Sequence, residues 1–137
     1  MCRLRETPVL VLSYNSPALV VEDDFLLAMQ MKDYLADFGC HETLIATRLE
    51  EAFLALSAGI RFAVIDVSLA GESCNELAAK LAVAGIPYIY VSGYQREDFP
   101  DLPPAPWVSK PASEAHLREA ISTALAQSPL GLDPTES

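Results

Sequence analysis

Carboxylate, hydroxyl and ammonium side chains each follow directly after a short apolar segment of this chain. The carboxylates are Glu22 and Asp23 after the first such segment and Asp66 after a later one, the hydroxyl is Ser92 and the ammonium is Lys110. Ligands of open parallel α/β sheets bind beyond the carboxyl ends of the strands. If the apolar segments are parallel strands, these five side chains meet at one edge of one sheet.

This set of groups favours phosphoryl chemistry. Three carboxylates a few ångströms apart repel one another, so without a counter-ion the pKa of at least one of them should rise. Mg²⁺ removes this cost, because it binds one or two protein carboxylates together with water and phosphate oxygens. Asp66 can then attack a phosphoryl group as a nucleophile and form an aspartyl phosphate. Lys110 would neutralise charge from the other side of the site.

Two serines complete the predicted site. The hydroxyl of Ser92 can donate to a phosphoryl oxygen, and Gly93 leaves the approach open. Ser68 lies on the turn two residues after Asp66, where its backbone carbonyl is a candidate third metal ligand. The predicted metal ligands are therefore Glu22, Asp23, Asp66 and the carbonyl of Ser68.

Each group also has a purely structural explanation. An Asp at a strand end is most often a turn or cap residue, and Glu22 and Asp23 alone are typical of the acidic first turn of a helix. Ser92 alone would belong to a turn, and Lys110 to a surface dipeptide. The ordered set, with intervals of 43, 26 and 18 residues from Asp23 onward, favours the functional interpretation.

The alternation of apolar runs with helical periodicity predicts an α/β fold. Apolar runs predict five strands, at residues 18–23, 41–46, 62–66, 86–91 and 107–109. Helical spacing predicts helices at residues 25–38, 47–59, 73–85 and 113–127. Right-handed crossovers then give a flavodoxin-like three-layer sandwich. The commonest order of a five-stranded parallel sheet of this kind is 2-1-3-4-5, which we expect here.

Cap signals and prolines set the predicted helix limits. Thr47 with Glu50, and Ser73 with Glu76, have the spacing of capping boxes, and Ser113 can cap the last helix. Between the fourth and fifth strands, prolines exclude a regular fourth helix and leave at most one turn near residues 95–99. These prolines are Pro100, Pro103, Pro104 and Pro106.

The composition narrows the classes of partner. The formal charge is −10, with 19 acidic and 9 basic residues, so a nucleic acid is an unfavourable direct partner. The three cysteines are an odd number without metal-ligand spacing, which is typical of reduced thiols in a cytoplasmic protein. No apolar run approaches the roughly 20 residues of a membrane span. We therefore expect a cytoplasmic protein that binds no membrane.

The chain length predicts one domain, at residues 18–127. Residues 1–17 are predicted to be an extension; Pro8 to Leu12 is a candidate edge strand, but packing or fraying without a strand is preferred. Residues 128–137 are predicted to be a flexible tail, because they are polar and rich in Pro and Gly. With ten residues after Gln127, we expect no effector domain to follow.

Four motifs, taken in order, resemble the receiver domain of two-component response regulators over about residues 17–127. They are Val20-Val21-Glu22-Asp23-Asp24, Val64-Ile65-Asp66-Val67-Ser68-Leu69-Ala70-Gly71, Val91-Ser92-Gly93 and Val108-Ser109-Lys110-Pro111. Each motif is short, but the ordered set is highly specific for this family.

The resemblance implies a role for each residue of the set. It implies that Asp66 is the phosphoacceptor, Asp23 a direct Mg²⁺ ligand and Glu22 an ion-binding partner that acts through water. It implies that Ser92 is the switch hydroxyl, and that Lys110 precedes a cis peptide bond. Further positions implied by the resemblance are Trp107 as the aromatic switch residue, and Ser68 and Tyr94 as residues that tune the phosphoryl lifetime.

The chain departs from the family pattern around its output surface. The loop after Asp66 lacks the usual proline, and the fourth helix is reduced. The segment Tyr90-Val91-Ser92-Gly93-Tyr94 is similar to the Phe-Ala-Thr-Gly-Tyr signature of a stand-alone receiver subgroup, whose partners are often HWE-type histidine kinases. The implied partners are a histidine kinase or a phosphotransfer protein, together with a downstream protein.

Other function classes fit the residues less well. A pseudo-receiver that binds a partner constitutively is the alternative, although a degraded acid pocket would be expected for it. A hydrolase using Asp66 would need a second carboxylate two residues later, where Ser68 stands, so we expect no enzyme. A nucleotide-binding domain would need a Gly-rich loop after the first strand, and none is present there.

Overall fold

Five parallel strands form the central sheet of the computed structural model, which describes residues 17–69 and 71–127. The strands are β1 (Ala18–Val21), β2 (Thr43–Ala46), β3 (Phe62–Asp66), β6 (Tyr88–Ser92) and β7 (Trp107–Ser109). Their order in the sheet is β2-β1-β3-β6-β7, and every neighbouring pair is parallel. The predicted order of the five successive strands is therefore confirmed.

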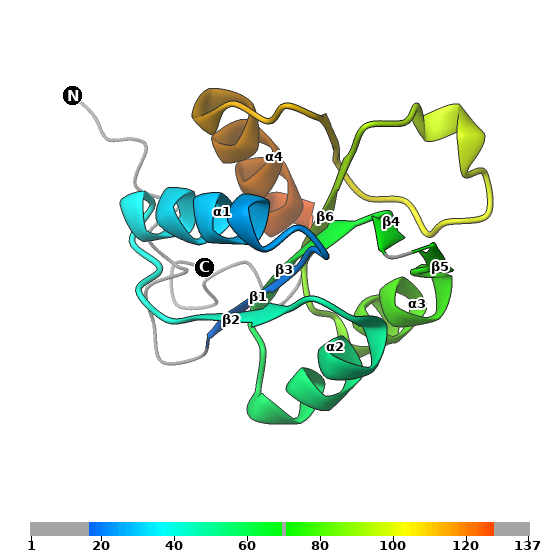
Figure 1. Cartoon of the computed structure of the whole chain (residues 1–137), viewed down its shortest axis with the longest axis horizontal. Coiled ribbons are helices and arrows are strands. Elements are labelled where there is room, and N and C mark those ends of the chain that lie inside the picture. The colour runs from blue at the N-terminus through cyan, green and yellow to red at the C-terminus, as the bar shows by residue number, and fades with distance from the viewer. Residues whose placement is uncertain (1–16, 70, 128–137) are drawn as a thin grey trace.

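Helices cover both faces of this sheet, as Figure 1 shows. One face carries α1 (Phe25–Asp37) and α4 (Glu114–Gln127), and the other carries α2 (Leu49–Ala55) and α3 (Asn75–Ala84). A 3₁₀ turn, η2 (Leu56–Ala58), follows α2. Each face has its own apolar core, because the residues of β1, β3 and β6 are all buried and alternate between the two faces. The predicted three-layer sandwich is confirmed.

Two of the three predicted helix caps are wrong in detail. The helices α2 and α3 begin one residue later than predicted, with Arg48 and Cys74 at the N-cap positions, and neither cap makes a side-chain hydrogen bond. Because of this shift, Glu51 instead of Glu50 accepts the hydrogen bond from the Thr47 N–H, at 2.8 Å. The hydroxyl of Ser73 likewise accepts from the Asn75 N–H, at 3.1 Å, and forms no capping box with Glu76.

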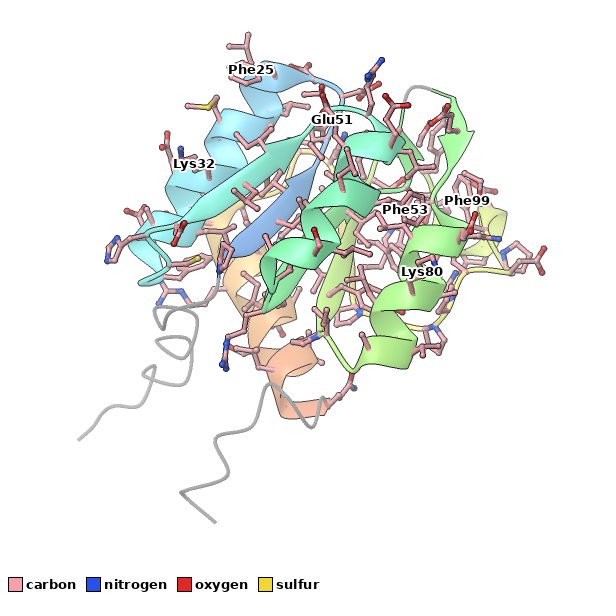
Figure 2. The ribbon with its side chains drawn as sticks, turned by 90° about the horizontal axis from the view of Figure 1, so that it is seen from below. Phe25, Lys32, Glu51, Phe53, Lys80 and Phe99 are labelled. Carbon is pink, nitrogen blue, oxygen red and sulfur yellow. The ribbon has the colours of Figure 1, made fainter. Side chains whose placement is uncertain are left out.

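The caps of the other two helices follow the sequence closely. Asp24 caps α1, since its carboxylate accepts from the N–H groups of Leu26 and Leu27 at 3.0 and 3.3 Å. The predicted cap of α4 is confirmed, because the Ser113 hydroxyl accepts from the His116 N–H at 3.1 Å. Figure 2 shows Phe25 projecting outward at the start of α1, where it is 58% exposed.

The strand limits differ from the prediction by one or two residues at four of the ten ends. The strand β6 begins at Tyr88 because the preceding residues finish α3: Gly85 has φ +76° and the Ile86 N–H bonds to the Leu81 carbonyl at 3.0 Å. The strand β1 ends at Val21, so Glu22 lies just beyond the strand.

A small antiparallel ribbon after β3 was absent from the prediction. It pairs β4 (Ser68–Leu69) with β5 (Glu72–Ser73). Gly71, at φ +80°, lies in its turn, where a left-handed backbone favours glycine. This ribbon occupies the loop in which the family pattern has a proline.

The connection between β6 and β7 contains one short turn, η3 (Arg96–Asp98), in agreement with the predicted loss of a regular fourth helix. Among the described residues, no helix is long and apolar enough to cross a membrane. The predicted N-terminal extension and C-terminal tail concern residues 1–16 and 128–137, which lie outside the described residues.

Candidate functional site

The register of the sheet brings the predicted site residues to one edge. Val21 lies beside Ile65, Asp66 beside Val91, and Ser92 beside Ser109. The carboxyl ends of the three pairs of strands therefore lie level with one another. Each predicted site residue except Trp107, which begins β7, is the last residue of a strand or one of the first residues after it.

An ammonium group joins two of the carboxylates. The Lys110 Nζ lies 3.1 Å from Glu22 Oε1 and 3.3 Å from Asp66 Oδ2. Both carboxylates are buried, with Glu22 4% and Asp66 5% exposed. The structure thus places two acids and one base, from three different strand ends, in contact with one another.

The three acids can share one metal ion. Glu22, Asp23 and Asp66 each offer a carboxylate oxygen, and these oxygens lie within 4.8 Å of one another. Hard oxygen ligands of this kind suit Mg²⁺. Two of the acids are buried while Asp23 is exposed, so the cluster opens to solvent on one side. The donor set therefore fits the predicted ion.

The electrostatics of Glu22 show the repulsion expected of such a cluster. Burial, followed by the hydrogen bond to Asp66 and the charge of Asp66, raises the pKa of Glu22 from 4.5 to about 7. Lys110 and the N–H of Asp24 act in the opposite direction, but they do not outweigh these effects. A divalent cation would remove this cost, which supports the fit of the site to Mg²⁺.

The neighbouring carboxylates favour the charged form of Lys110. Burial alone would lower the pKa of its ammonium, but the charge of Asp66 and the contacts with Glu22 outweigh burial and raise it. Lys110 is therefore fully charged at neutral pH and offers a fixed positive charge beside Asp66.

Each of the two serines makes one hydrogen bond that involves a backbone N–H group. The Ser68 N–H donates to Asp66 Oδ1 at 3.1 Å, which holds the carboxylate in place. The Ser92 hydroxyl is fully buried and accepts from the Tyr94 N–H at 2.9 Å. The predicted role of the Ser68 carbonyl as a metal ligand stays a prediction.

A depression of about 410 Å³ lies over these groups. Its lining includes Tyr94, and also Asp24 and Leu27, which were not among the predicted site residues. The other lining residues are Glu22, Asp23, Asp66, Ser68, Gly93 and Lys110. The depression leads from solvent to the predicted phosphoacceptor.

The predicted switch residue Trp107 does not line this depression and is hydrogen-bonded to the loop after Ser92. Its indole Nε1–H donates to the Tyr94 carbonyl at 3.1 Å. The predicted cis bond between Lys110 and Pro111 is confirmed.

Solved structures of receiver domains resemble this chain over most of its length. The receiver domain of PhyR from Erythrobacter litoralis is 27% identical to it, with a TM-score of 0.73 over 84% of this chain and 93% of that one. This chain has the fold of the response-regulator receiver domains, and the solved structures that it resembles are receiver domains. No protein-family model and no curated protein sequence matches it.

Two other solved structures have a similar fold. SdrG from Sphingomonas melonis Fr1 is 26% identical, with a TM-score of 0.68 over 80% of this receiver domain and 96% of its own chain. The response regulator PhyR from Brucella abortus is 23% identical, with a TM-score of 0.67 over 86% of this receiver domain. This receiver domain covers 51% of that longer protein.

Proposed function

We propose that this receiver domain accepts a phosphoryl group on Asp66 from a histidine kinase or a phosphotransfer protein, and that the modification switches a protein-interaction surface. The contact of Asp66 with Lys110, at 3.3 Å, carries the proposal. It combines a buried carboxylate nucleophile with a fixed positive charge, at the edge where the depression opens.

The residues divide the chemistry among them. A carboxylate oxygen of Asp66 forms the new O–P bond while the P–N bond to the donor imidazole breaks, and the imidazole keeps the electron pair. The Lys110 ammonium pairs with a phosphoryl oxygen and offsets the charge that the group brings. The Ser68 N–H orients the carboxylate from the other side, at 3.1 Å.

Glu22, Asp23 and Asp66, with the Ser68 carbonyl, would hold Mg²⁺, which supplies a compact positive charge to the phosphoryl oxygens. Asp23 is the exposed member of this set, so it is reached first from solvent. Ser92 offers its hydroxyl proton to the phosphoryl group, since its oxygen already accepts from the Tyr94 N–H.

We further propose that the domain belongs to the subgroup with the Phe-Ala-Thr-Gly-Tyr signature and acts in the cytoplasm. The single turn η3 between β6 and β7 supports this assignment, because it leaves the fourth helix reduced. The partner kinases would then include the HWE type. The output surface would include Trp107 and the loop before it.

Mass spectrometry of the intact protein tests the function directly. Acetyl phosphate with Mg²⁺ should add one phosphoryl group to the wild type and none to Asp66→Asn. EDTA should suppress the addition. An unmodified wild type, or equal modification of Asp66→Asn, would rule out Asp66 as the phosphoacceptor and favour a constitutive binding module.

A further inference from the structure

The loop between β6 and β7 contains one 3₁₀ turn, and side chains donate to several of its remaining backbone carbonyls. The guanidinium of Arg96 donates to the Phe99 carbonyl at 2.5 Å and to the Leu102 carbonyl at 3.0 Å. Arg96 thus closes residues 96–102 into a loop from within. A planar guanidinium suits this task, since it offers several donors in a fixed fork.

The same guanidinium lies against two aromatic rings of the sheet. Its central carbon is 5.6 Å from the ring centre of Trp107 and 6.0 Å from that of Tyr90. The two rings also contact each other, with centres 5.6 Å apart. Arg96 therefore joins the loop to Trp107, the residue that the sequence resemblance to receiver domains implies to be the switch.

A continuous series of contacts runs from Arg96 back to the phosphorylation site. Trp107 donates through its indole to the Tyr94 carbonyl, at 3.1 Å, and the Tyr94 N–H donates to the Ser92 hydroxyl, at 2.9 Å. If the Ser92 side chain turns toward a phosphoryl group on Asp66, it breaks its hydrogen bond with Tyr94, and Tyr94 is the residue that Trp107 contacts. Arg96 lies over the ring of Trp107, which would have to move in the switch.

We propose that Arg96 is a positioning residue that locks Trp107 and the 95–102 loop in the resting arrangement. The proposal rests on the proposed function for its link to Asp66. If the contacts of Arg96 are stronger in the unphosphorylated state, they stabilise that state. They must then weaken before the phosphorylated state can form. Arg96 then sets how readily the modified site changes the output surface.

The first test uses Trp107 as an internal probe, since it is the only tryptophan in the chain. Without any phosphoryl donor, Arg96→Ala should raise the constant for acrylamide quenching and shift the emission to the red. Arg96→Lys keeps the charge but lacks the planar fork, so its quenching should stay near that of Arg96→Ala. Quenching of Arg96→Ala equal to that of the wild type would overturn the lock, as would full restoration by Arg96→Lys.

Arg118 provides the matched control. Its guanidinium also lies over an aromatic ring, 4.9 Å from the centre of Phe38, but on the opposite side of the fold from Arg96. Arg118→Ala should leave Trp107 quenching unchanged. A rise as large as that of Arg96→Ala would show that loss of any such arginine loosens the domain, and would overturn the assignment to Arg96.

The second test measures the link to Asp66 by calorimetric titration with beryllofluoride, a phosphoryl mimic, in the presence of Mg²⁺. Arg96→Ala should bind the mimic on the order of fivefold more tightly than the wild type, because the resting state has lost stabilisation. Equal or weaker binding would refute the coupling. Absence of Asp66-dependent binding in the wild type would instead refute the proposed function, while the quenching comparison would still decide whether Arg96 holds Trp107.

Discussion

The ammonium of Lys110 lies 3.3 Å from the carboxylate of Asp66, although 44 residues separate them in the sequence. The same ammonium lies 3.1 Å from Glu22, so one cation serves two buried acids. This cation stands where a metal ion would also be attracted. Phosphoryl transfer and metal binding should therefore respond to Lys110 in opposite ways.

Lys110→Met should separate these two effects. Loss of the positive charge should slow phosphorylation by acetyl phosphate by about 10² to 10³-fold, because it removes a preorganised group from the transition state. The same change should raise Mg²⁺ affinity by about tenfold, because a like charge near the ion is lost. Mass spectrometry and Mg²⁺ titration check the two effects.

Lys80→Met is the control for this variant, since Lys80 lies exposed on α3, away from the site (Figure 2). It should change neither quantity. A Lys110→Met protein that loses Mg²⁺ affinity and keeps its phosphorylation rate would contradict the assigned role.

The raised pKa of Glu22 predicts an unusual dependence of stability on pH. Because the folded pKa of about 7 lies above the ordinary value of 4.5, the native state binds more protons than the unfolded state between these values. Without Mg²⁺, the free energy of unfolding should therefore fall as the pH rises from 4.5 to 7, by roughly 1 to 3 kcal/mol. Lys110 does not alter this window, because its raised pKa affects stability only in the alkaline range.

Urea unfolding in EDTA and in Mg²⁺ measures this dependence. Mg²⁺ should stabilise the protein more at pH values above the Glu22 pKa, since it binds the deprotonated carboxylates. Glu22→Gln should remove most of the decline in EDTA. Stability that increases with pH across this range in EDTA would show that Glu22 is not the controlling group.

Ser92→Ala should uncouple the site from the loop. The variant leaves the Tyr94 N–H without its buried acceptor, which should cost about 1 kcal/mol of stability. Asp66 should still be phosphorylated, but the Trp107 emission should no longer respond to beryllofluoride. An emission change equal to that of the wild type would show that Trp107 responds by another route.

Tyr94→Ala should shorten the life of the phosphorylated state. Tyr94 borders the depression over Asp66 and is 54% exposed, with its ring packed on Phe99 at 5.8 Å between centres. A bulky ring at this place would hinder the attacking water, so the variant should lose its phosphoryl group several-fold faster, and Tyr94→Phe should not. Slower loss in Tyr94→Ala than in the wild type would contradict this prediction, and the mass of the protein over time measures it.

The sheet was predictable because its strands carry an unambiguous signal. Every residue of β3 and β6 is buried, and such strands have apolar runs without polar alternation. The predicted strand order is the commonest one for a five-stranded doubly wound sheet. The contact between Asp66 and Lys110 was predictable for the same reason, since each residue stands at or just beyond the end of a strand.

The features that the sequence did not predict are set by contacts made in the folded chain, or belong to elements too short to show a hydrophobic periodicity. The ribbon of β4 and β5 has two residues on each side, which is too few to show alternation. The caps of α2 and α3 moved by one residue, which changed the partner of Thr47 from Glu50 to Glu51. Cap spacing alone does not fix such a shift.

The role of Arg96 carried no signal of its own in the sequence. A single arginine in a proline-rich segment is typical of an exposed loop, and its neighbours Tyr90 and Trp107 come from two separate strands. The sequence predicted that a carboxylate pKa would rise in the acidic cluster. The choice of Glu22 depends on its burial and its contact with Asp66 in the folded chain.

A crystal structure with Mg²⁺ and beryllofluoride would show whether the mimic and the ion share the site around Asp66. We expect the mimic bonded to a carboxylate oxygen of Asp66, the ion held by Asp23 and Asp66, and the mimic in contact with Lys110 and Ser92. A mimic or an ion bound elsewhere, or a site that stays free of both at saturating concentrations, would contradict this expectation.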